Sequence, residues 1–600
     1  MKNNFKILSL LVVFGFGCSH LEKPVVETAS ETPSFIKLDD DLPTYLEMNK
    51  RMPTALSVYK MTGQCGGLPR VEVKTAPGFC VGQIDAGDGL VFPRTALALP
   101  TGEILLVDMG GWTPMNGRIY LYKKNSAGGY TRSLLFNAKV INNPKFKKMV
   151  DRPNQISMGP DRKIYVGAPN AIVRFRMDSP DPQSTFEMVV DNIPNVGLHP
   201  LKAFTFDNEN SLFVNLGSAT NVCQKSGSLG DILRNCPEVE ENEKSQALVR
   251  KYRALPNGTY DPNYEIYSRG FRNSMVLLWD SYRQVLLQAE NGRDAIDKFN
   301  PQLNTKKLPH EELNIVRPGK HYGWPYCYDN NLVNPEWAGH NCDHYEKPYL
   351  LLPPHSAPLS ALLYQGNMLP AWYQNRVIMS LHGYEEKGHR LVTFLRDDRG
   401  MPTGVPLSIV YGWDARGTQL QGSPVGVSMM PDGSLLIAED KSRKLLRVFY
   451  DPKVGDGKPV REIDGETQTG NDEARRRENL KHALEERLRE PEPPIFSLIQ
   501  DRLIDKHCAS CHTGENARGL ELGWYDDIGN ERRIREHQKA MDIFIRIGGA
   551  QDLPDDAPEK NIELAPMPPD GFPSRTEAER QEHKNLRALF KRWMDGVGAE

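Results

Sequence analysis

Short apolar runs recur along the first three quarters of the chain, and a turn signal built from Pro, Gly, Asp, Asn or Ser precedes each run. Runs of this kind, bounded by turn residues, are typical of short β-strands. The pattern occurs six times, at residues 100–108, 160–168, 208–216, 281–289, 373–381 and 431–439.

A second predicted strand, with a basic or polar residue inside it, follows each of these runs. The second strands begin at Gly117, Ala171, Ala247, Glu312, His389 and Arg443. Repeats of about 50 to 90 residues with paired short strands are typical of a β-propeller with long loops. A solenoid would have a shorter repeat, and a sandwich would not need six near-copies of one hairpin. We therefore predict a mainly β, six-bladed propeller over residues 61–453, with a ligand site among the loops around its axis.

The pattern changes after residue 453. Residues 454–494 are rich in glycine and charge, and their leucines form only a thin helical stripe, so we interpret them as a charged linker. Residues 495–600 contain a predicted closing helix from about Glu577 to Val597, with leucines, Phe590 and a tryptophan on one face. This segment is long enough for a small all-α domain.

The last segment contains the sequence Cys508-Ala509-Ser510-Cys511-His512. Two cysteines followed at once by a histidine are what c-type haem attachment requires, since two thioethers fix the porphyrin and the imidazole reaches the iron. A redox CxxC pair would need a βαβ setting, and a zinc site would need a second pair of ligands nearby. Met567 lies in a proline-rich loop and is the predicted sixth ligand. We therefore predict a cytochrome c domain with haem c over residues 495–600.

The N-terminus has the features of an export signal. Two lysines precede an apolar stretch at residues 7–17 that is too short for a stable membrane span. Cys18 follows Gly17 where a bacterial lipoprotein would be cleaved and acylated, although Gly15 replaces the usual aliphatic residue. We predict a signal peptide over 1–18, a polar tether over 19–60, and an exported protein on the periplasmic side or in the cell envelope, lipid-anchored to a bacterial membrane.

Charge and cysteine content agree with this compartment. A net charge of −3 gives no reason to expect nucleic-acid binding. Of nine cysteines, six remain after the lipidation and haem cysteines are set aside, and an oxidising compartment favours disulfides. Six cysteines allow fifteen connectivities, so pairing by sequence proximity is a guess. The neighbouring pairs are Cys65 with Cys80, Cys223 with Cys236, and Cys327 with Cys342.

Several motifs between residues 85 and 450 together resemble one family. They are Leu198-His199-Pro200, residues 214–223, Ser268 to Asn273, Tyr322 to Tyr326, His355 to Leu359, and residues 422–433. This set is similar to the sorbosone dehydrogenase and soluble glucose dehydrogenase type of propeller. The resemblance implies a propeller that oxidises sugars with pyrroloquinoline quinone (PQQ) and calcium. A fused cytochrome fits this chemistry, because the reduced quinol needs an electron acceptor.

The resemblance also implies roles for individual residues. Hydride transfer from an alcohol to a quinone requires a base for the hydroxyl proton, and a neutral imidazole suits this task. The resemblance gives His199 this position; the alternative is a loop histidine without a function. PQQ carries carboxylates that favour the arginine fork, and Arg272 with Asn273 matches the family's cofactor pair. Its alternative is a loop salt bridge.

A calcium site is implied by the loop from Glu290 to Asp294. Calcium takes six to eight oxygen ligands, many of them backbone carbonyls. The resemblance assigns the carbonyls of Gly292 and Arg293 to this ion, whereas acidic loops are otherwise usually just solvated. His382, His355 and Arg94 would reach toward the cofactor or substrate from other blades.

The chain also departs from the family pattern. Ser423 replaces a common arginine, residues 384–387 differ from the usual Ser-Trp-Asn-Arg, and Asn154 replaces a frequent histidine. Two interpretations follow: another cation, such as Arg390 or Arg416, replaces the missing ones, or PQQ binds weakly or not at all.

The sequence therefore predicts an exported quinohaemoprotein that oxidises a sugar or other alcohol or aldehyde with PQQ and passes electrons to haem c and then to a respiratory acceptor. The main alternative is a non-catalytic propeller that binds a glycan or a protein and is tethered to an electron-transfer cytochrome c. A redox-sensing lipoprotein, which would differ only in lacking turnover, is a third.

Overall fold

The computed structural model describes residues 59–139, 151–225, 231–240, 242, 245–383, 388–397, 399–413 and 422–461, with the helical positions 581, 584, 585, 587 and 590. The predicted lipidation and haem residues, Cys18, Cys508, Cys511, His512 and Met567, lie outside these ranges, as do most of the predicted tether and linker. Within the described ranges, no helix is both long and apolar enough to cross a membrane.

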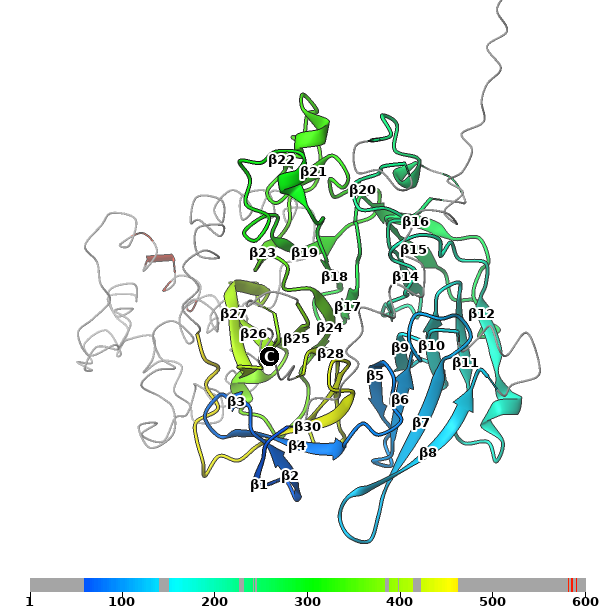
Figure 1. The fold of residues 1–600 in the computed structure, drawn as a ribbon, viewed down its shortest axis with the longest axis vertical. Coiled ribbons are helices and arrows are strands. Elements are labelled where there is room, and N and C mark those ends of the chain that lie inside the picture. The colour runs from blue at the N-terminus through cyan, green and yellow to red at the C-terminus, as the bar shows by residue number, and fades with distance from the viewer. Residues whose placement is uncertain are drawn as a thin grey trace, which may run out of the picture.

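Six β-sheets surround a central axis as the blades of a propeller (Figure 1). The first blade consists of β5 (Pro93–Ala98), β6 (Ile104–Asp108), β7 (Arg118–Lys124) and β8 (Tyr130–Asn137). The second consists of β9 (Gln155–Met158), β10 (Ile164–Ala168), β11 (Ala171–Phe175) and β12 (Glu187–Val190). The third consists of β13 (Phe204–Phe206), β14 (Leu212–Leu216), β15 (Leu248–Tyr252), β16 (Glu265–Arg269) and β20 (Lys320–His321).

The remaining blades follow the same plan. The fourth blade consists of β17 (Val276–Asp280), β18 (Val285–Glu290), β19 (Glu311–Val316) and β23 (Leu350–Leu352). The fifth consists of β24 (Pro358–Leu363), β25 (Val377–Leu381), β26 (Arg390–Arg396), β27 (Pro402–Tyr411) and β3 (Lys74–Thr75). The sixth consists of β28 (Pro424–Met429), β29 (Leu435–Glu439), β30 (Lys444–Tyr450), β4 (Phe79–Asp85), β2 (Leu68–Val71) and β1 (Met61–Cys65). The prediction of a six-bladed propeller is confirmed.

The connections between strands carry only short elements. A separate hairpin pairs β21 (Cys327–Tyr328) with β22 (Leu332–Val333). The 3₁₀ turns are η1 (Pro182–Thr185), η2 (Pro237–Val239), η3 (Ile296–Lys298), η4 (Pro335–Trp337) and η5 (Ala371–Tyr373).

The predicted strand pairs are the two middle strands of the six blades. Every residue of β6, β10, β14, β25 and β29 is buried, because neighbouring blades cover both faces of each sheet. This double burial explains why these strands appear in the sequence as nearly continuous apolar runs rather than as alternating ones. The hydrophobic clusters lie between blades; one of them joins Val107 and Ile119 of the first blade to Val166 and Val173 of the second.

N-terminal strands complete the last two blades. The strand β4 pairs antiparallel with β30, with Phe79 opposite Tyr450 and Val81 opposite Val448. In the fifth blade, β3 pairs with β27 through Thr75 and Val410. The ring is therefore closed by hydrogen bonds between segments from the two ends of the propeller.

Three disulfides join the cysteines that are neighbours in the sequence. Cys65 is bonded to Cys80, Cys223 to Cys236, and Cys327 to Cys342. The first ties β1 to β4 at the ring closure, and the other two lie in long loops of the third and fourth blades. These are the pairs that sequence proximity favours.

Candidate active site

A cavity of about 250 Å³ lies at one end of the propeller axis. Its walls come from residues just before the first strand of a blade, such as His199, Arg272 and Ala357, and from residues just after the second strand, such as His382 and Asp440. The first two strands of a blade are antiparallel, so the start of one and the end of the other meet at the same edge of the sheet. This arrangement brings loops from several blades to one site.

Most of the predicted site residues line this cavity. They are Arg94, His199, Arg272, Asn273, Gly292, His355 and His382. Among the described residues, Arg390 does not line it, so this residue does not replace the missing cations, and Arg416 lies outside the described ranges. Arg94 is instead the second arginine of the cavity. The roles assigned to these residues by resemblance stay predictions.

His199 has a defined hydrogen-bonding arrangement. Its Nδ1 atom lies 2.8 Å from the carbonyl oxygen of Ser218 and 3.1 Å from Ser218 Oγ. Burial of the ring and the positive charge of Arg272 lower the pKa of His199 well below its usual range. Because a carbonyl oxygen can only accept, Nδ1 carries the proton and Nε2 is left as the basic nitrogen.

The backbone beneath His199 leaves no room for a side chain. A Cβ atom added to Gly217 would lie 2.5 Å from the Cβ of His199 and 2.8 Å from its carbonyl oxygen. Contacts this close do not occur without displacement of a neighbour. Gly217 therefore allows the β14 strand end and the His199 loop to pack against each other.

Arg272 is held by three neighbouring groups. Its Nη2 atom lies 2.7 Å from Asp294 Oδ2, its Nε donates to Asn221 Oδ1 at 3.0 Å, and its Nη1 donates to the carbonyl oxygen of Asn291. The Arg272 side chain is buried, whereas 67% of the Asp294 side chain is exposed. The guanidinium is thus fixed at the cavity wall by a partner that water also reaches.

Arg94 and His382 share one buried carboxylate. Arg94 Nη1 lies 3.2 Å from Asp440 Oδ2, and His382 Nε2 lies 2.8 Å from Asp440 Oδ1. Burial opposes the ionised form, but the charges of His382 and Arg94 hold the pKa of Asp440 below its usual range. This wall of the cavity therefore contains a compensated charge cluster rather than a bare positive patch.

Buried glutamates lie next to the predicted calcium loop. Glu311 accepts hydrogen bonds from the backbone nitrogens of Gly292 and Ala357. Burial raises the pKa of Glu311 to about 7, although the nearby His355 opposes the shift. Glu290 accepts from the backbone nitrogen of Arg272 at 2.9 Å, and burial raises its pKa to about 8.

The guanidinium of Arg293 points away from the cavity. It pairs with Glu336 and lies over the ring of Phe299, and Arg293 is not among the residues that line the cavity. Only its backbone could serve the cavity, and the predicted carbonyl ligation of calcium stays a prediction.

Two buried oxygen atoms near this loop have no hydrogen-bond partner within the described part of the chain. They are Asn273 Oδ1 and Asn291 Oδ1, and both residues line the cavity. A buried acceptor without a donor is costly, so these oxygens are available to a ligand that supplies a donor or a cation.

Sequence reasoning missed several residues of the cavity. The motifs include Asp294 only as part of the calcium loop, and they do not include Glu311, Asp440, Trp112 or Met275. Acidic residues beside strands are ordinarily solvated, so the residue type alone does not distinguish Asp440 or Glu311 from surface carboxylates. Their positions at strand ends, Asp440 directly after β29 and Glu311 at the start of β19, were the available signal.

Comparisons with known proteins agree with the motif analysis. Residues 156–391 match the family model described as glucose/sorbosone dehydrogenase. A Borreliella burgdorferi protein, described as uncharacterized, is 27% identical over 195 residues, which cover 31% of this chain and 49% of the relative. The chain thus spans about half the length of this curated relative.

Solved structures with similar folds include three proteins from different organisms. An iodide structure of the carbohydrate-active enzyme family AA12 from Trichoderma reesei is 19% identical in sequence, with a TM-score of 0.49, and the match covers 65% of this chain and 100% of that chain. The holo form of the pyranose dehydrogenase PQQ domain from Coprinopsis cinerea is 18% identical, with a TM-score of 0.48, and the match covers 64% of this chain and 98% of that chain. The apo form of the soluble aldose sugar dehydrogenase from Escherichia coli is 17% identical, with a TM-score of 0.39, and the match covers 62% of this chain and 100% of that chain.

The matched segment supplies much of the cavity, including His199, Arg272, Asn273 and Gly292. The resemblance predicted from the sequence motifs is confirmed, because residues 156–391 of this chain match the glucose/sorbosone dehydrogenase family model.

Proposed function

We propose that the propeller oxidises a hydroxyl group of a sugar or related alcohol, or an aldehyde group in its hydrated form, with PQQ and calcium held in the axial cavity. The observation that carries this proposal is His199, whose Nδ1 hydrogen bond to the Ser218 carbonyl leaves Nε2 basic beside Arg272. The family description of residues 156–391 supports an oxidoreductase that acts on sugars.

The residues of the cavity fit both cofactors. Among the described residues, the arginines on its walls are Arg272 and Arg94, which pair with Asp294 and Asp440, and arginine suits carboxylates better than lysine does. The buried oxygens Asn273 Oδ1 and Asn291 Oδ1 match a hard cation, which takes oxygen ligands. The PQQ carboxylates would lie against the arginines, and calcium would lie beside the Gly292 loop.

The side chains perform binding and proton transfer. When bound, PQQ supplies the hydride acceptor, and calcium supplies positive charge beside it. His199 takes the substrate hydroxyl proton at Nε2, and its lowered pKa keeps it neutral and able to accept. Phe92, Trp112, Leu201 and Met275 form an apolar part of the wall and exclude water from the reacting group.

The electrons taken from the substrate must then pass to an acceptor. We extend the proposal to the predicted haem at Cys508, Cys511 and His512, with Met567 as the sixth ligand, because each oxidised substrate releases two electrons and a haem accepts one at a time. The final acceptor would be a respiratory carrier of the cell envelope. Three disulfides in the propeller support an oxidising compartment, and Cys18 would provide the lipid anchor.

A reconstitution experiment tests this function. The full chain, purified with its haem, is titrated with PQQ and calcium and then mixed with a panel of aldoses and polyols while the reduced haem band is recorded. We expect haem reduction that requires substrate, PQQ and calcium together. Tight PQQ binding without haem reduction by any substrate would contradict the enzyme, and no PQQ binding would favour the alternative of a glycan- or protein-binding propeller.

A further inference from the structure

The loop from Gly217 to Cys223 contacts both functional groups of the cavity. It begins where β14 ends, and Ser218 accepts from His199 through its carbonyl oxygen. The backbone nitrogen of Ser218 donates to the Arg272 carbonyl at 2.7 Å. At its other end, Asn221 accepts from Arg272 Nε and donates to the Asp294 carbonyl. One short loop therefore positions the predicted base and the predicted cofactor arginine.

Ser218 presents only acceptors to His199. Its hydroxyl donates to the Thr220 carbonyl at 2.6 Å, so its single hydrogen is used there. The oxygen lone pairs of the hydroxyl and the Ser218 carbonyl both face His199 Nδ1. The Ser218 carbonyl favours the proton on Nδ1, and the position of the Thr220 backbone decides whether the serine hydroxyl supports or opposes it, because a displaced Thr220 carbonyl would free the hydroxyl to donate to Nδ1.

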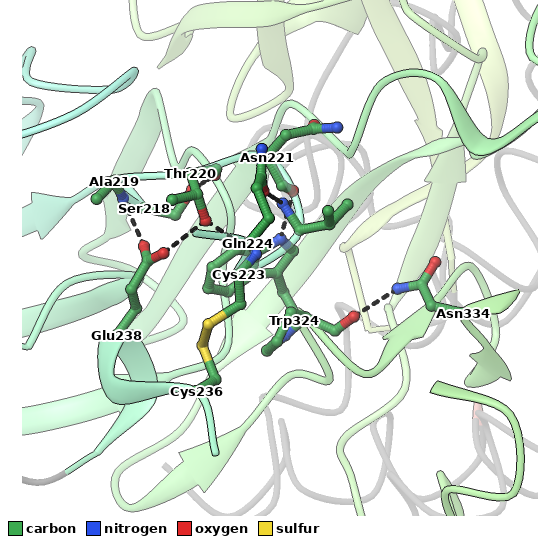
Figure 2. The surroundings of a disulfide bond; sticks show 12 residues. Ser218, Ala219, Thr220, Asn221, Cys223, Gln224, Cys236, Glu238, Trp324 and Asn334 are labelled. Atoms are coloured by element: carbon green, nitrogen blue, oxygen red, sulfur yellow. Dashed lines mark hydrogen bonds between the residues drawn. A yellow bond between two sulfur atoms is a disulfide. The ribbon is translucent and has the colours of Figure 1, made fainter. Parts of the chain in front are cut away.

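Glu238 fixes Thr220 from below, as Figure 2 shows. Its Oε1 accepts from Thr220 Oγ1 at 2.6 Å, and its Oε2 accepts from the Ala219 backbone nitrogen at 2.5 Å. Glu238 is buried, and both of its carboxylate oxygens are directed at this loop. Burial raises the pKa of Glu238, and the hydrogen bonds from Thr220 and the Ala219 backbone oppose that shift. Because these bonds favour the ionised carboxylate, and charge-assisted hydrogen bonds exceed neutral ones in strength, Glu238 is a specific constraint on the loop.

A disulfide also joins the Gly217–Cys223 loop to the segment that contains Glu238. Cys223 ends the loop, and its partner Cys236 lies two residues before Glu238 (Figure 2). The backbone nitrogen of Cys223 also donates to Thr220 Oγ1 at 2.8 Å. The two cysteines and Glu238 lie close enough together to meet one cation, but the sulfurs are bonded to each other and offer no thiolate. The cluster is therefore a brace for the loop rather than a metal site.

We propose that Glu238, Thr220 and the Cys223–Cys236 disulfide are positioning groups that fix the tautomer of His199, so that Nδ1 is protonated and Nε2 is the base. The brace acts through Thr220 and Ser218, and none of its members lines the cavity. The consequence for activity rests on the proposed function, whereas the tautomer itself is a property of the chain without cofactor or substrate.

Nitrogen-15 NMR of the full chain, labelled at histidine and free of PQQ, reads the tautomer directly. The His199 signal is assigned by its loss in His199→Asn. In the wild type we expect the proton on Nδ1. In Thr220→Val, which has nearly the same shape but no hydroxyl, and in Glu238→Gln, we expect a mixture of tautomers. Thr220→Ser keeps the hydroxyl and should restore the wild-type signal.

The disulfide has a matched control within the same fold. Cys65–Cys80 spans 15 residues and Cys223–Cys236 spans 13, so removal of either should lower the melting temperature by a similar amount. We expect C223S/C236S to change the His199 signal and C65S/C80S to leave it as in the wild type. Thermal unfolding and circular dichroism verify that each variant is folded.

In the reconstituted enzyme, Thr220→Val should lower kcat about tenfold or more with little change in KM, because the base is affected and the binding walls are not. Folded Thr220→Val and C223S/C236S proteins with the wild-type tautomer would overturn the proposal. If the wild type oxidises no sugar, the proposed function fails, and the NMR result still decides whether the brace sets the tautomer.

Discussion

Arg272 and Asp294 form an ion pair at the rim of the cavity, with 2.7 Å between Nη2 and Oδ2. The carboxylate of Asp294 is largely exposed and the guanidinium is buried, so the same arginine can meet a ligand carboxylate only in competition with Asp294 or alongside it.

This pairing gives a prediction for cofactor affinity. Asp294→Asn removes a negative charge beside the site of a carboxylate-bearing cofactor, and we expect PQQ to bind about two- to fivefold more tightly, the range of a solvent-screened pair. Asp261→Asn is the control, because it removes the carboxylate of another ion pair, with the exposed Arg253 at 2.9 Å, outside the cavity. Isothermal titration calorimetry measures both; weaker binding by Asp294→Asn would show that Asp294 is needed to orient Arg272.

The assignment of the base predicts a separation of catalysis from binding. In His199→Asn we expect kcat to fall by roughly 10²- to 10⁴-fold, the usual contribution of a general base, while PQQ affinity changes little. His340→Asn serves as the control, since His340 lies outside the cavity and stacks on Tyr326. Stopped-flow measurement of haem reduction compares the three proteins, and a His199→Asn enzyme with unchanged kcat would exclude His199 as the base.

Close packing below the base predicts an effect from a single methyl group. A Cβ at position 217 would overlap His199, so Gly217→Ala should displace the imidazole and reduce kcat by at least tenfold. At Gly129 the nearest atom to an added Cβ is 3.6 Å away, and Gly129→Ala should behave as the wild type. Equal activity of the two variants, both folded by circular dichroism, would mean that the loop absorbs the methyl group without moving His199.

A buried glutamate away from the calcium loop predicts a dependence of stability on pH. Glu439 accepts from the Ser442 backbone nitrogen at 2.9 Å, and burial raises its pKa to about 7, with Asp440 adding to the shift. A pKa raised in the folded state contributes stability that is complete below the unfolded value, about 4.5, and is lost as pH rises through about 7.

Glu439→Gln mimics the protonated side chain and lacks this dependence. Between pH 4.5 and pH 8, the free energy of unfolding of the wild type should fall relative to that of Glu439→Gln by on the order of 3 kcal/mol. Urea unfolding at several pH values, without ligands, measures the difference, and parallel curves for the two proteins would contradict the raised pKa.

The repeated strand pairs were predictable because each blade buries its two middle strands on both faces. Because both faces of such a strand are buried, its sequence is a nearly unbroken apolar run, as in residues 104–107 of β6. The ring closure was not predictable in the same way, since β4 pairs with β30 across more than 350 residues and no local pattern encodes a partner that distant.

The site shows the same division. His199, Arg272 and Gly292 could be predicted because they lie in motifs that resemble those of the sorbosone and glucose dehydrogenase family. Asp440 and Glu238 were missed because a carboxylate has the same appearance in the sequence whether water or a buried hydrogen-bond donor surrounds it. Glu238 is recognisable only after the Cys223–Cys236 bond and the Ser218 loop are placed in space.

Because β4 is hydrogen-bonded to β30, the blades form a closed ring, and the fold does not require the chain to begin at any particular blade. Joining the two ends of the propeller and cutting the chain in a loop between two other blades should leave every sheet with its full set of strands. Circular permutants of residues 59–461 would then retain the fold. Permutants cut at different blade junctions could be compared to find the cut that most reduces ligand binding in the cavity.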